Sequence, residues 1–372
     1  MTALVYGTLR FELAIDAQLG PLLKRPDKLP GGVRDALRLG AFEILYRGTP
    51  RPAAANAWVE IVKRPEPRLA GLTNAVLRRV ERTDLPPGTA AGLPTWLYDE
   101  WAARFGPERA AATAAGLNDP DPLWLTAYHP EATHALLADG CRVAFGPLEG
   151  TLKVDLGGRS LTALRAFQNG WVQPQNPAST LPVRLLEPAP GDRVYDLASG
   201  GGVKAAQLAA AGAVVTSFEL HAAKLRRAQG NLARLGLHAE GVVHDLRRVP
   251  DAPPAEKVLL DAPCSGTGTL RGNPELRTRV TPGGVAELAA LQRELLGTAA
   301  ALTAPGGLLV YAVCALTDAE GPEQARRFLE EYPFEAEPFL FDRPADNGPE
   351  GSTILPLGGL DGFYLARFRR HE

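Results

Sequence analysis

Two cysteines and one aspartate lie at positions of the sequence where their side chains could do chemistry. Asp261 ends the apolar run Val-Leu-Leu, and Cys264 follows it in the stretch Asp-Ala-Pro-Cys-Ser-Gly-Thr-Gly. Cys314 lies near the end of a second apolar run, over 310–316. Such runs, bounded by turn residues, are typical of strands buried on both faces, and ligands in open α/β sheets bind beyond the carboxyl ends of the strands. We therefore expect all three side chains at one pocket mouth, although a lone cysteine after a strand is more often a small buried hydrophobic residue.

Two thiols and a carboxyl group at one mouth suit chemistry on a pyrimidine base. C5 of cytosine is a poor nucleophile until a thiolate adds to C6. A carboxyl group near N3 stabilises that adduct by donating a proton or a hydrogen bond. A second thiol, or another base, is then useful when the sulfur of the enzyme is eliminated from C6 again. Two thiols above a nucleotide pocket would be unusual for a hydride-transfer enzyme.

A glycine-rich turn upstream predicts a nucleoside pocket. A strand over 193–198 runs into three glycines and then a helix, and glycines let the backbone approach a ligand closely. Glu219 ends the next strand, where a carboxylate suits the two hydroxyls of a ribose, and Asp245 is placed to accept from an adenine amino group. The turn alone does not separate NAD from S-adenosylmethionine, and a turn that only packs is an open alternative.

Composition and charge limit the class of protein. The 372 residues are 45% hydrophobic and 22% charged with a net charge of −2, so we expect a folded chain. We expect no signal peptide, because the N-terminus lacks a charged start followed by an apolar core and a cleavage site. We expect no membrane span, since no apolar run approaches the ~20 residues that a span needs. Cys141, Cys264 and Cys314 form no zinc pattern, so we expect no metal and interpret Cys141 as structural. A cytoplasmic monomer with reduced thiols is the simplest expectation.

Changes of pattern along the chain predict three domains. Residues 1–83 carry apolar residues at helical spacing with prolines between the segments, which predicts an all-α bundle. Within it, residues 1–80 hold 13 Lys and Arg against 7 Asp and Glu, an excess that suits RNA phosphates, although a solvated helical surface would look the same. Residues 84–170 predict a Pro/Gly-rich linker over 84–95 and a small α+β domain. Residues 171–372 alternate strands with helices, which predicts a mostly parallel, Rossmann-like α/β domain.

Individual elements of the last domain can also be predicted. We expect strands over 193–198, 214–220, 241–244, 257–262, 307–313 and 362–369, and helices over 204–211, 222–235, 285–302 and 320–331. Ser179 or Thr180 is expected to cap a helix that leads into 183–186.

Several segments resemble the Sun/Fmu-type (RsmB-like) ribosomal RNA cytosine-C5 methyltransferases. The most specific match is the Asp-Ala-Pro-Cys-Ser-Gly-Thr-Gly stretch over 261–268, followed by Arg271, Asn273 and Pro274. The segments over 6–10, 39–46 and 74–78 are similar to the family's N-terminal helical domain, which resembles NusB, and 361–367 is similar to its closing strand.

The resemblance implies a role for each candidate residue. Cys314 would attack C6, Cys264 would help to release the product, and Asp261 would hold the cytosine beside the cofactor. S-adenosylmethionine would be cradled by Ala198, Ser199, Gly200, Gly201, Gly202, Val203 and Lys204, with Glu219 on the ribose, Asp245 on the adenine and Asp261 beside the cofactor. The target would be RNA, with 16S rRNA as the expected substrate.

Three hypotheses of function follow from the sequence. The leading one is an S-adenosylmethionine-dependent RNA cytosine-C5 methyltransferase. The second is an RNA-binding or ribosome-assembly factor with a degenerate methyltransferase domain, because the family's Pro, second Gly and Thr in the cofactor loop are here Gly201, Val203 and Ala205. The third, a nucleotide-dependent oxidoreductase, depends only on the glycine-rich turn.

Overall fold

The computed structural model describes residues 2–119, 122–341 and 344–372, and the chain divides into two compact units. Unit 1 comprises Met1–Asp119 and Leu270–Arg279, and unit 2 comprises Pro120–Thr269 and Val280–Glu372. The domain boundaries that the sequence suggests, after residues 83 and 170, remain a prediction.

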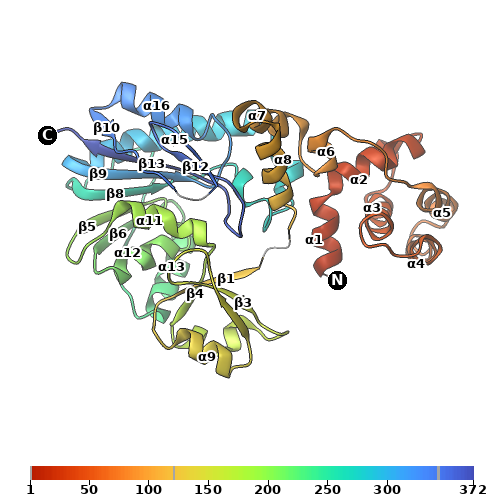
Figure 1. Ribbon diagram of the computed structural model, residues 1–372, viewed down its shortest axis with the longest axis horizontal. Helices are drawn as coiled ribbons and strands as arrows, with labels where there is room; N and C mark the ends of the chain where they lie inside the picture. The colour runs from red at the N-terminus through yellow and green to blue at the C-terminus, as the bar shows by residue number, and fades with distance from the viewer. Residues whose placement is uncertain (1, 120–121, 342–343) are drawn as a thin grey trace. The chain divides into compact units, whose positions relative to one another are not determined.

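Unit 1 is built from short helices in the part of the chain that the structure describes (Figure 1). They are α1 (Thr2–Arg10), α2 (Glu12–Leu19), α3 (Gly31–Leu45), α4 (Arg51–Lys63), α5 (Ala70–Arg79), α6 (Pro87–Ala90), α7 (Thr95–Phe105), α8 (Pro107–Gly116) and α14 (Leu276–Arg279). Val33, Leu37 and Ala41 lie on the buried face of α3, as their spacing predicts. The prediction of a helical N-terminal region is confirmed, although α6 lies within the predicted linker over 84–95.

Arginine side chains anchor the segment Leu270–Arg279 in unit 1. The guanidinium of Arg277, which is 1% exposed, donates at 2.9 Å to the carbonyl of Ala91 and at 2.9 Å to that of Leu117. Arg271 is also buried and donates at 3.0 Å to the last carbonyl of α8. Because these carbonyls end helices or turns, they have no helical N–H to accept from, and the arginines satisfy them.

Unit 2 contains a small antiparallel sheet in which four of the described strands pair in the order β2-β3-β1-β4. Its elements are β1 (Leu123–Ala127), α9 (Ala132–Ala138), β2 (Arg142–Phe145), β3 (Thr151–Asp155), α10 (Arg165–Gln168) and β4 (Val172–Pro174). Leu125, Leu136, Cys141 and Leu152 are buried together in its core. The predicted small α+β fold is thus confirmed, and Cys141 packs in its interior.

The second sheet of unit 2 joins nine of the described strands in the order β11-β12-β13-β9-β8-β5-β6-β7, with β10 paired to β13. Its strands are β5 (Arg193–Leu197), β6 (Val214–Glu219), β7 (Glu240–Val243), β8 (Ala255–Asp261), β9 (Thr303–Val313), β10 (Phe334–Ala336), β11 (Ala345–Asn347), β12 (Ser352–Ile354) and β13 (Phe363–Arg370). Strands β7, β6, β5, β8 and β9 are parallel, and β13 joins β9 antiparallel. The carboxyl ends of the parallel strands, where ligands bind in such sheets, therefore meet at one edge.

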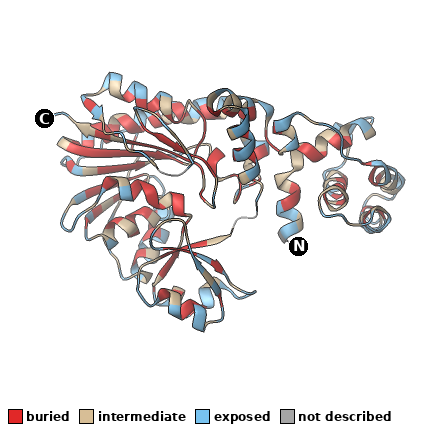
Figure 2. Cartoon of the chain, viewed as in Figure 1, coloured by how far each residue is buried: buried red, intermediate tan, exposed pale blue. Residues whose placement is uncertain are grey.

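Helices cover both faces of this sheet, which explains why its strands are continuously apolar (Figures 1 and 2). The elements α15 (Pro282–Leu302) and α16 (Pro322–Glu331) pack on one face. On the other face lie α11 (Leu181–Leu186), α12 (Val203–Ala210) and α13 (Ala222–Arg234). A strand covered on both sides must present apolar side chains in both directions. The predicted Rossmann-like fold is confirmed.

Two details differ from the sequence-based expectation. The predicted helix near 183–186 is present as α11, but neither Ser179 nor Thr180 caps it with its side chain. Instead the Asn176 side chain accepts from the Ala178 N–H at 3.0 Å and caps the preceding 3₁₀ turn, Pro177–Thr180. Strands β10, β11 and β12 have no counterpart in the sequence-based prediction, because each has only three residues and too short a pattern to recognise.

Among the described residues, no helix has the length and apolarity that a membrane crossing requires.

Candidate active site

The two cysteines of the sequence motifs meet at the carboxyl ends of β8 and β9. These strands are parallel neighbours in which Asp261 pairs with Ala312, and the N–H of Ala262 donates to the Ala312 carbonyl at 2.9 Å just beyond the paired region. Cys264 and Cys314 follow, and their Sγ atoms are 3.3 Å apart. Both side chains are half-buried. The expected convergence of the two thiols is found.

Backbone contacts fix the loops that carry the two sulfurs. The N–H of Gly268 donates to the Cys314 carbonyl at 2.9 Å, and the hydroxyl of Thr267 accepts from the N–H of Leu316 at 2.8 Å. Gly268 also accepts from the N–H of Gly362 at 2.8 Å. A Cβ atom at position 268 would lie 2.0 Å from the Gly362 carbonyl oxygen, so only glycine fits there. The Ser-Gly-Thr-Gly part of the motif thereby holds the Cys314 loop against the Cys264 loop.

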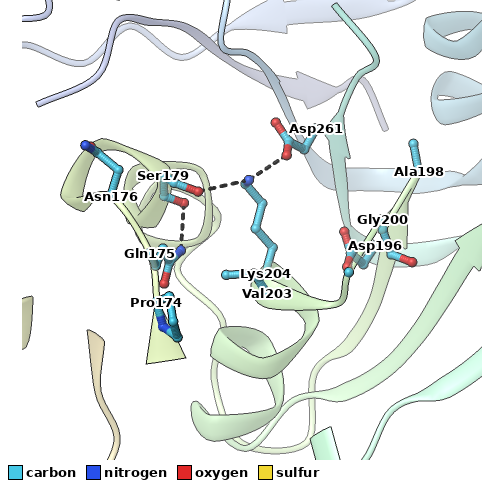
Figure 3. Close-up of a pocket in the computed structure, with 12 residues that line it drawn as sticks. Pro174, Gln175, Asn176, Ser179, Asp196, Ala198, Gly200, Val203, Lys204 and Asp261 are labelled. Carbon is cyan, nitrogen blue, oxygen red and sulfur yellow. Dashed lines mark hydrogen bonds and ion pairs between the residues drawn. The ribbon is translucent and has the colours of Figure 1, made fainter. Parts of the chain in front are cut away.

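Asp261 is paired with the amine of Lys204 rather than left free at the pocket mouth (Figure 3). The Lys204 Nζ lies 2.5 Å from Asp261 Oδ2 and 3.3 Å from the Ser179 hydroxyl. Burial lowers the pKa of Lys204, but the charge and hydrogen bond of Asp261, with the charge of Asp196, outweigh burial and leave that pKa raised. Lys204 is therefore a buried ammonium, ready to donate a hydrogen bond at the place where Asp261 was expected to act.

Asp196, the acid near the end of β5, is buried without a well-formed hydrogen bond. Its side chain is 0% exposed, and within the described part of the chain neither carboxyl oxygen accepts a hydrogen bond of normal distance and angle. The buried hydroxyl of Ser199 also has no partner there. Burial raises the pKa of Asp196 to about 7, an effect that the charge of Lys204 reduces and that of Asp261 reinforces. Buried polar groups are costly to leave unsatisfied, so these atoms fit a ligand that donates hydrogen bonds into the cavity.

The glycine-rich turn between β5 and α12 has the unusual backbone that the sequence suggests. Gly200 and Gly202 adopt positive φ angles of 57° and 74°, and so does Ala198, at 57°. Glu219 secures this turn, because its carboxylate accepts from the N–H of Gly200 at 2.9 Å and from that of His221 at 2.9 Å. A left-handed conformation at a non-glycine residue is uncommon and often marks a functional turn.

Two cavities share walls made by Ala198, Gly200 and Asp261, and Figure 3 shows the residues that line the first of them. The first measures ≈ 270 Å³, and its lining also includes Pro174, Gln175, Asn176, Ser179, Asp196, Ser199, Gly201, Val203 and Lys204. The second measures ≈ 550 Å³, and its lining also includes Glu219, Leu220, His221, Lys224, His244, Asp245, Leu246, Arg247, Ala262, Pro263, Leu291 and Leu295. A polar cavity next to a larger apolar one with acids on its wall suits a ligand with an amino-acid end and a nucleoside end.

Asp245 lies at the second cavity but is already paired. Arg247 donates to its carboxylate at 2.6 Å, and this hydrogen bond lowers the pKa of Asp245 to about 2. Arg247 therefore competes for the oxygens that the sequence interpretation assigned to an adenine amino group.

The sequence interpretation missed the buried Asp196 carboxylate, the Ser179 hydroxyl and the pairing of Lys204 with Asp261. The pattern of a strand that ends on an acid, used for Asp261, would also have singled out Asp196. No sequence pattern joins Lys204 to Asp261, because they lie on α12 and β8. No group of three or more potential metal ligands is found among the residues that the structure describes.

Known proteins match the chain along nearly its whole length. Residues 183–369 match the family model of the 16S rRNA methyltransferase RsmB/F, and residues 1–82 match the NusB family model. A protein of Thermus thermophilus described as ribosomal RNA small subunit methyltransferase B is 45% identical over 99% of this chain and 88% of its own length. The chain belongs to the RsmB/F methyltransferase family. The family resemblance drawn from the sequence motifs is thereby confirmed.

Further members and solved structures agree with this assignment. A Bacillus subtilis protein described as a probable ribosomal RNA small subunit methyltransferase B is 33% identical over 100% of this chain and 90% of its own. A methyltransferase homologue from Pyrococcus horikoshii, solved by crystallography, superposes with a TM-score of 0.66 and 25% identity, covering 75% of this chain and 96% of its own. The site described above thus belongs to a methyltransferase fold.

Proposed function

We propose that this RsmB/F member is an S-adenosylmethionine-dependent RNA cytosine-C5 methyltransferase that acts on 16S rRNA. The observation that carries the proposal is the 3.3 Å approach of the Cys264 and Cys314 sulfurs at the strand ends that also present the Lys204–Asp261 pair. Neither a hydride transfer nor a purely structural turn requires two thiols and a buried ammonium at one mouth. Activation of cytosine C5 by addition at C6 requires both a nucleophile and a group that stabilises the adduct.

In the proposed mechanism, the sulfur of Cys314 attacks C6 and forms a thioether. The electron density that moves onto the ring is stabilised by the ammonium of Lys204, which Asp261 holds in place by a short hydrogen bond. Asp261 thereby positions the group that holds the cytosine ring. Once C5 carries the methyl group, Cys264 as a thiolate accepts the C5 proton, so that the C5–C6 double bond re-forms and the S–C6 electron pair returns to Cys314.

The residues around the first cavity fit S-adenosylmethionine, which when bound supplies the methyl group. The buried carboxylate of Asp196, together with the unpartnered hydroxyl of Ser199, offers acceptors to an amino group. Glu219 would face the ribose, and the apolar wall with Leu291 and Leu295 would hold the adenine. Asp245 would contribute to the adenine end only together with Arg247, to which it is bonded.

The changed cofactor loop motivates the alternative of a degenerate methyltransferase domain that only binds RNA. Val203, one of the changed residues, begins α12 and lines the first cavity without filling it, since ≈ 270 Å³ remain beside it. A cavity of that size with unpartnered polar atoms favours ligand binding over loss of the site.

RNA is the proposed partner, as the relatives' descriptions indicate for those proteins. A cytosine has to leave its stack to reach two half-buried sulfurs, as base-modifying enzymes require. Unit 1 would supply phosphate contacts through its basic excess.

The proposal is tested by incubating the protein with unmodified 16S rRNA and S-adenosylmethionine labelled in its methyl group. We expect label on C5 of cytosine, its loss in Cys314→Ala, and its retention in Cys141→Ala, because Cys141 lies in the core of the small sheet. S-adenosylmethionine binding without any cytosine label would contradict the reaction. RNA binding without measurable cofactor binding by calorimetry would favour the degenerate alternative.

A further inference from the structure

Glu320 is a fully buried acid next to the two thiol loops that the sequence motifs do not include. Its side chain is 0% exposed and lies between β9 and α16. One carboxylate oxygen accepts from the N–H of Ser265 at 2.7 Å and from the Gln292 amide at 3.1 Å. The other accepts from the hydroxyls of Ser265 at 2.5 Å and Thr317 at 2.8 Å. Four donors on one carboxylate compensate for the cost of burying an ionised group.

These donors come from the segments that carry the sulfurs. Ser265 directly follows Cys264, and Thr317 comes three residues after Cys314. Gln292, on α15, also donates to the Pro263 carbonyl at 2.9 Å. Helix α15 is therefore linked to the Cys264 loop both directly and through Glu320. A single carboxylate thus joins both loops and the helix behind them.

The charge of Glu320 acts on Cys264. The hydrogen bond with Cys314 and then burial raise the pKa of the Cys264 thiol well above its usual value, and the charges of Cys314, Glu320 and Asp261 raise it further. The other ionisable groups near the two sulfurs are Lys204, whose charge interacts with Cys314, and Tyr311, whose hydroxyl donates to the Glu320 carbonyl at 2.7 Å.

We propose that Glu320 is a positioning residue that holds the two thiol loops together and keeps the proton of Cys264 in place while Cys314 attacks. Cys314 attacks as a thiolate, to which Cys264 donates its S–H across 3.3 Å. The inference deepens the proposed function, on which it rests, because it explains which of two adjacent thiols attacks.

The arrangement also orders the proton transfers. When Cys314 forms its bond to C6, its charge and its hydrogen bond with Cys264 disappear, and with them two causes of the raised pKa of Cys264. Cys264 then releases its proton to water and becomes the thiolate that accepts the C5 proton. The C5–H electron pair re-forms the C5–C6 double bond, and the S–C6 electron pair returns to Cys314. The proton given to water is the net proton that replacement of hydrogen by methyl must release.

The test is the pH dependence of iodoacetamide alkylation at each cysteine, followed by peptide mass spectrometry on the full chain without RNA or cofactor. Glu320→Gln keeps the shape and removes the charge, and the hydroxyls of Ser265 and Thr317 can rotate to accept from the new amide. We expect the Cys264 titration to move to lower pH, so that its alkylation near pH 8 becomes several-fold faster than in the control variant. The matched control Glu323→Gln removes an exposed charge on α16 and should behave as the wild type.

An unchanged Cys264 profile in folded Glu320→Gln would overturn the proposal, and so would an acceleration at Cys314 in place of Cys264. If Glu320→Gln does not fold, Ser265→Ala keeps the carboxylate and removes one donor, which strengthens its field and should move the Cys264 titration upward. A downward or absent shift there would equally overturn it. Because no methyl transfer is measured, failure of this test and failure of the proposed function are separate results.

Discussion

Replacing Asp196 by asparagine should change how the stability of the protein depends on pH. The carboxyl group of Asp196 is fully buried, and neither oxygen accepts a hydrogen bond of normal geometry in the described structure. Its ionisation therefore opposes folding. The amide introduced by Asp196→Asn has nearly the same shape and does not ionise, so the variant lacks this pH-dependent cost.

The size of the effect follows from the pKa of Asp196. Burial raises that pKa from its ordinary 3.8 to about 7. The folded state therefore holds this proton more tightly than the unfolded state does. The stabilising contribution of the protonated form is complete below the ordinary pKa and is lost as the pH rises to about 7. Three pKa units correspond to at most about 4 kcal/mol of unfolding free energy.

The measurement is urea unfolding of the wild type and Asp196→Asn at intervals between pH 4.5 and 8.5. Subtracting one curve from the other removes the contribution of the ionisable groups that do not interact with Asp196. We expect the variant to gain stability relative to the wild type as the pH rises, by a few kcal/mol over the range. A difference that stays constant within about 0.5 kcal/mol would show that Asp196 titrates normally and would refute the argument from its burial.

Two further predictions concern the cofactor turn and the motif glycine. Glu219→Ala should weaken S-adenosylmethionine binding, measured by calorimetry, by about tenfold or more, because it removes a charged acceptor and frees the turn. The control Glu240→Ala changes an exposed residue and should bind the cofactor as the wild type does. Equal affinities for the two variants would contradict the role given to Glu219. Gly268→Ala should lower the thermal unfolding midpoint by several degrees, through a loss of about 2 kcal/mol, because its Cβ would lie 2.0 Å from the Gly362 carbonyl oxygen. Gly283→Ala, which meets nothing within 4 Å, is the control, and equal midpoints for the two variants would disprove the steric argument.

The fold was largely predictable because its elements have regular and long patterns. Continuous apolar runs such as Val258–Leu260 identified strands covered on both faces, and residues recurring at helical spacing identified α3. The short strands β10, β11 and β12 escaped prediction because three residues carry no usable periodicity. The cap at Asn176 was missed because serine and threonine at 179 and 180 offered an equally good local pattern.

The site was predictable only where a local motif carries it. The convergence of Cys264 and Cys314 could be inferred because both follow apolar strands of one predicted parallel sheet, whose carboxyl ends meet at one edge. The pairing of Lys204 with Asp261 could not be inferred, since it depends on where α12 lies relative to β8. Glu320 was missed for the same reason, because its donors come from three separate segments that only the folded chain brings together.

The measurement that tests the central claim most directly is covalent capture of RNA by single cysteine variants. Each variant is incubated with unmodified 16S rRNA and S-adenosylmethionine and then separated on a denaturing gel. Cys264→Ala should retain a covalent RNA adduct, because Cys314 still attacks while release is blocked, and Cys314→Ala should form none. A covalent adduct in Cys314→Ala, or the absence of one in both variants while RNA and cofactor still bind, would contradict the assignment of the two sulfurs.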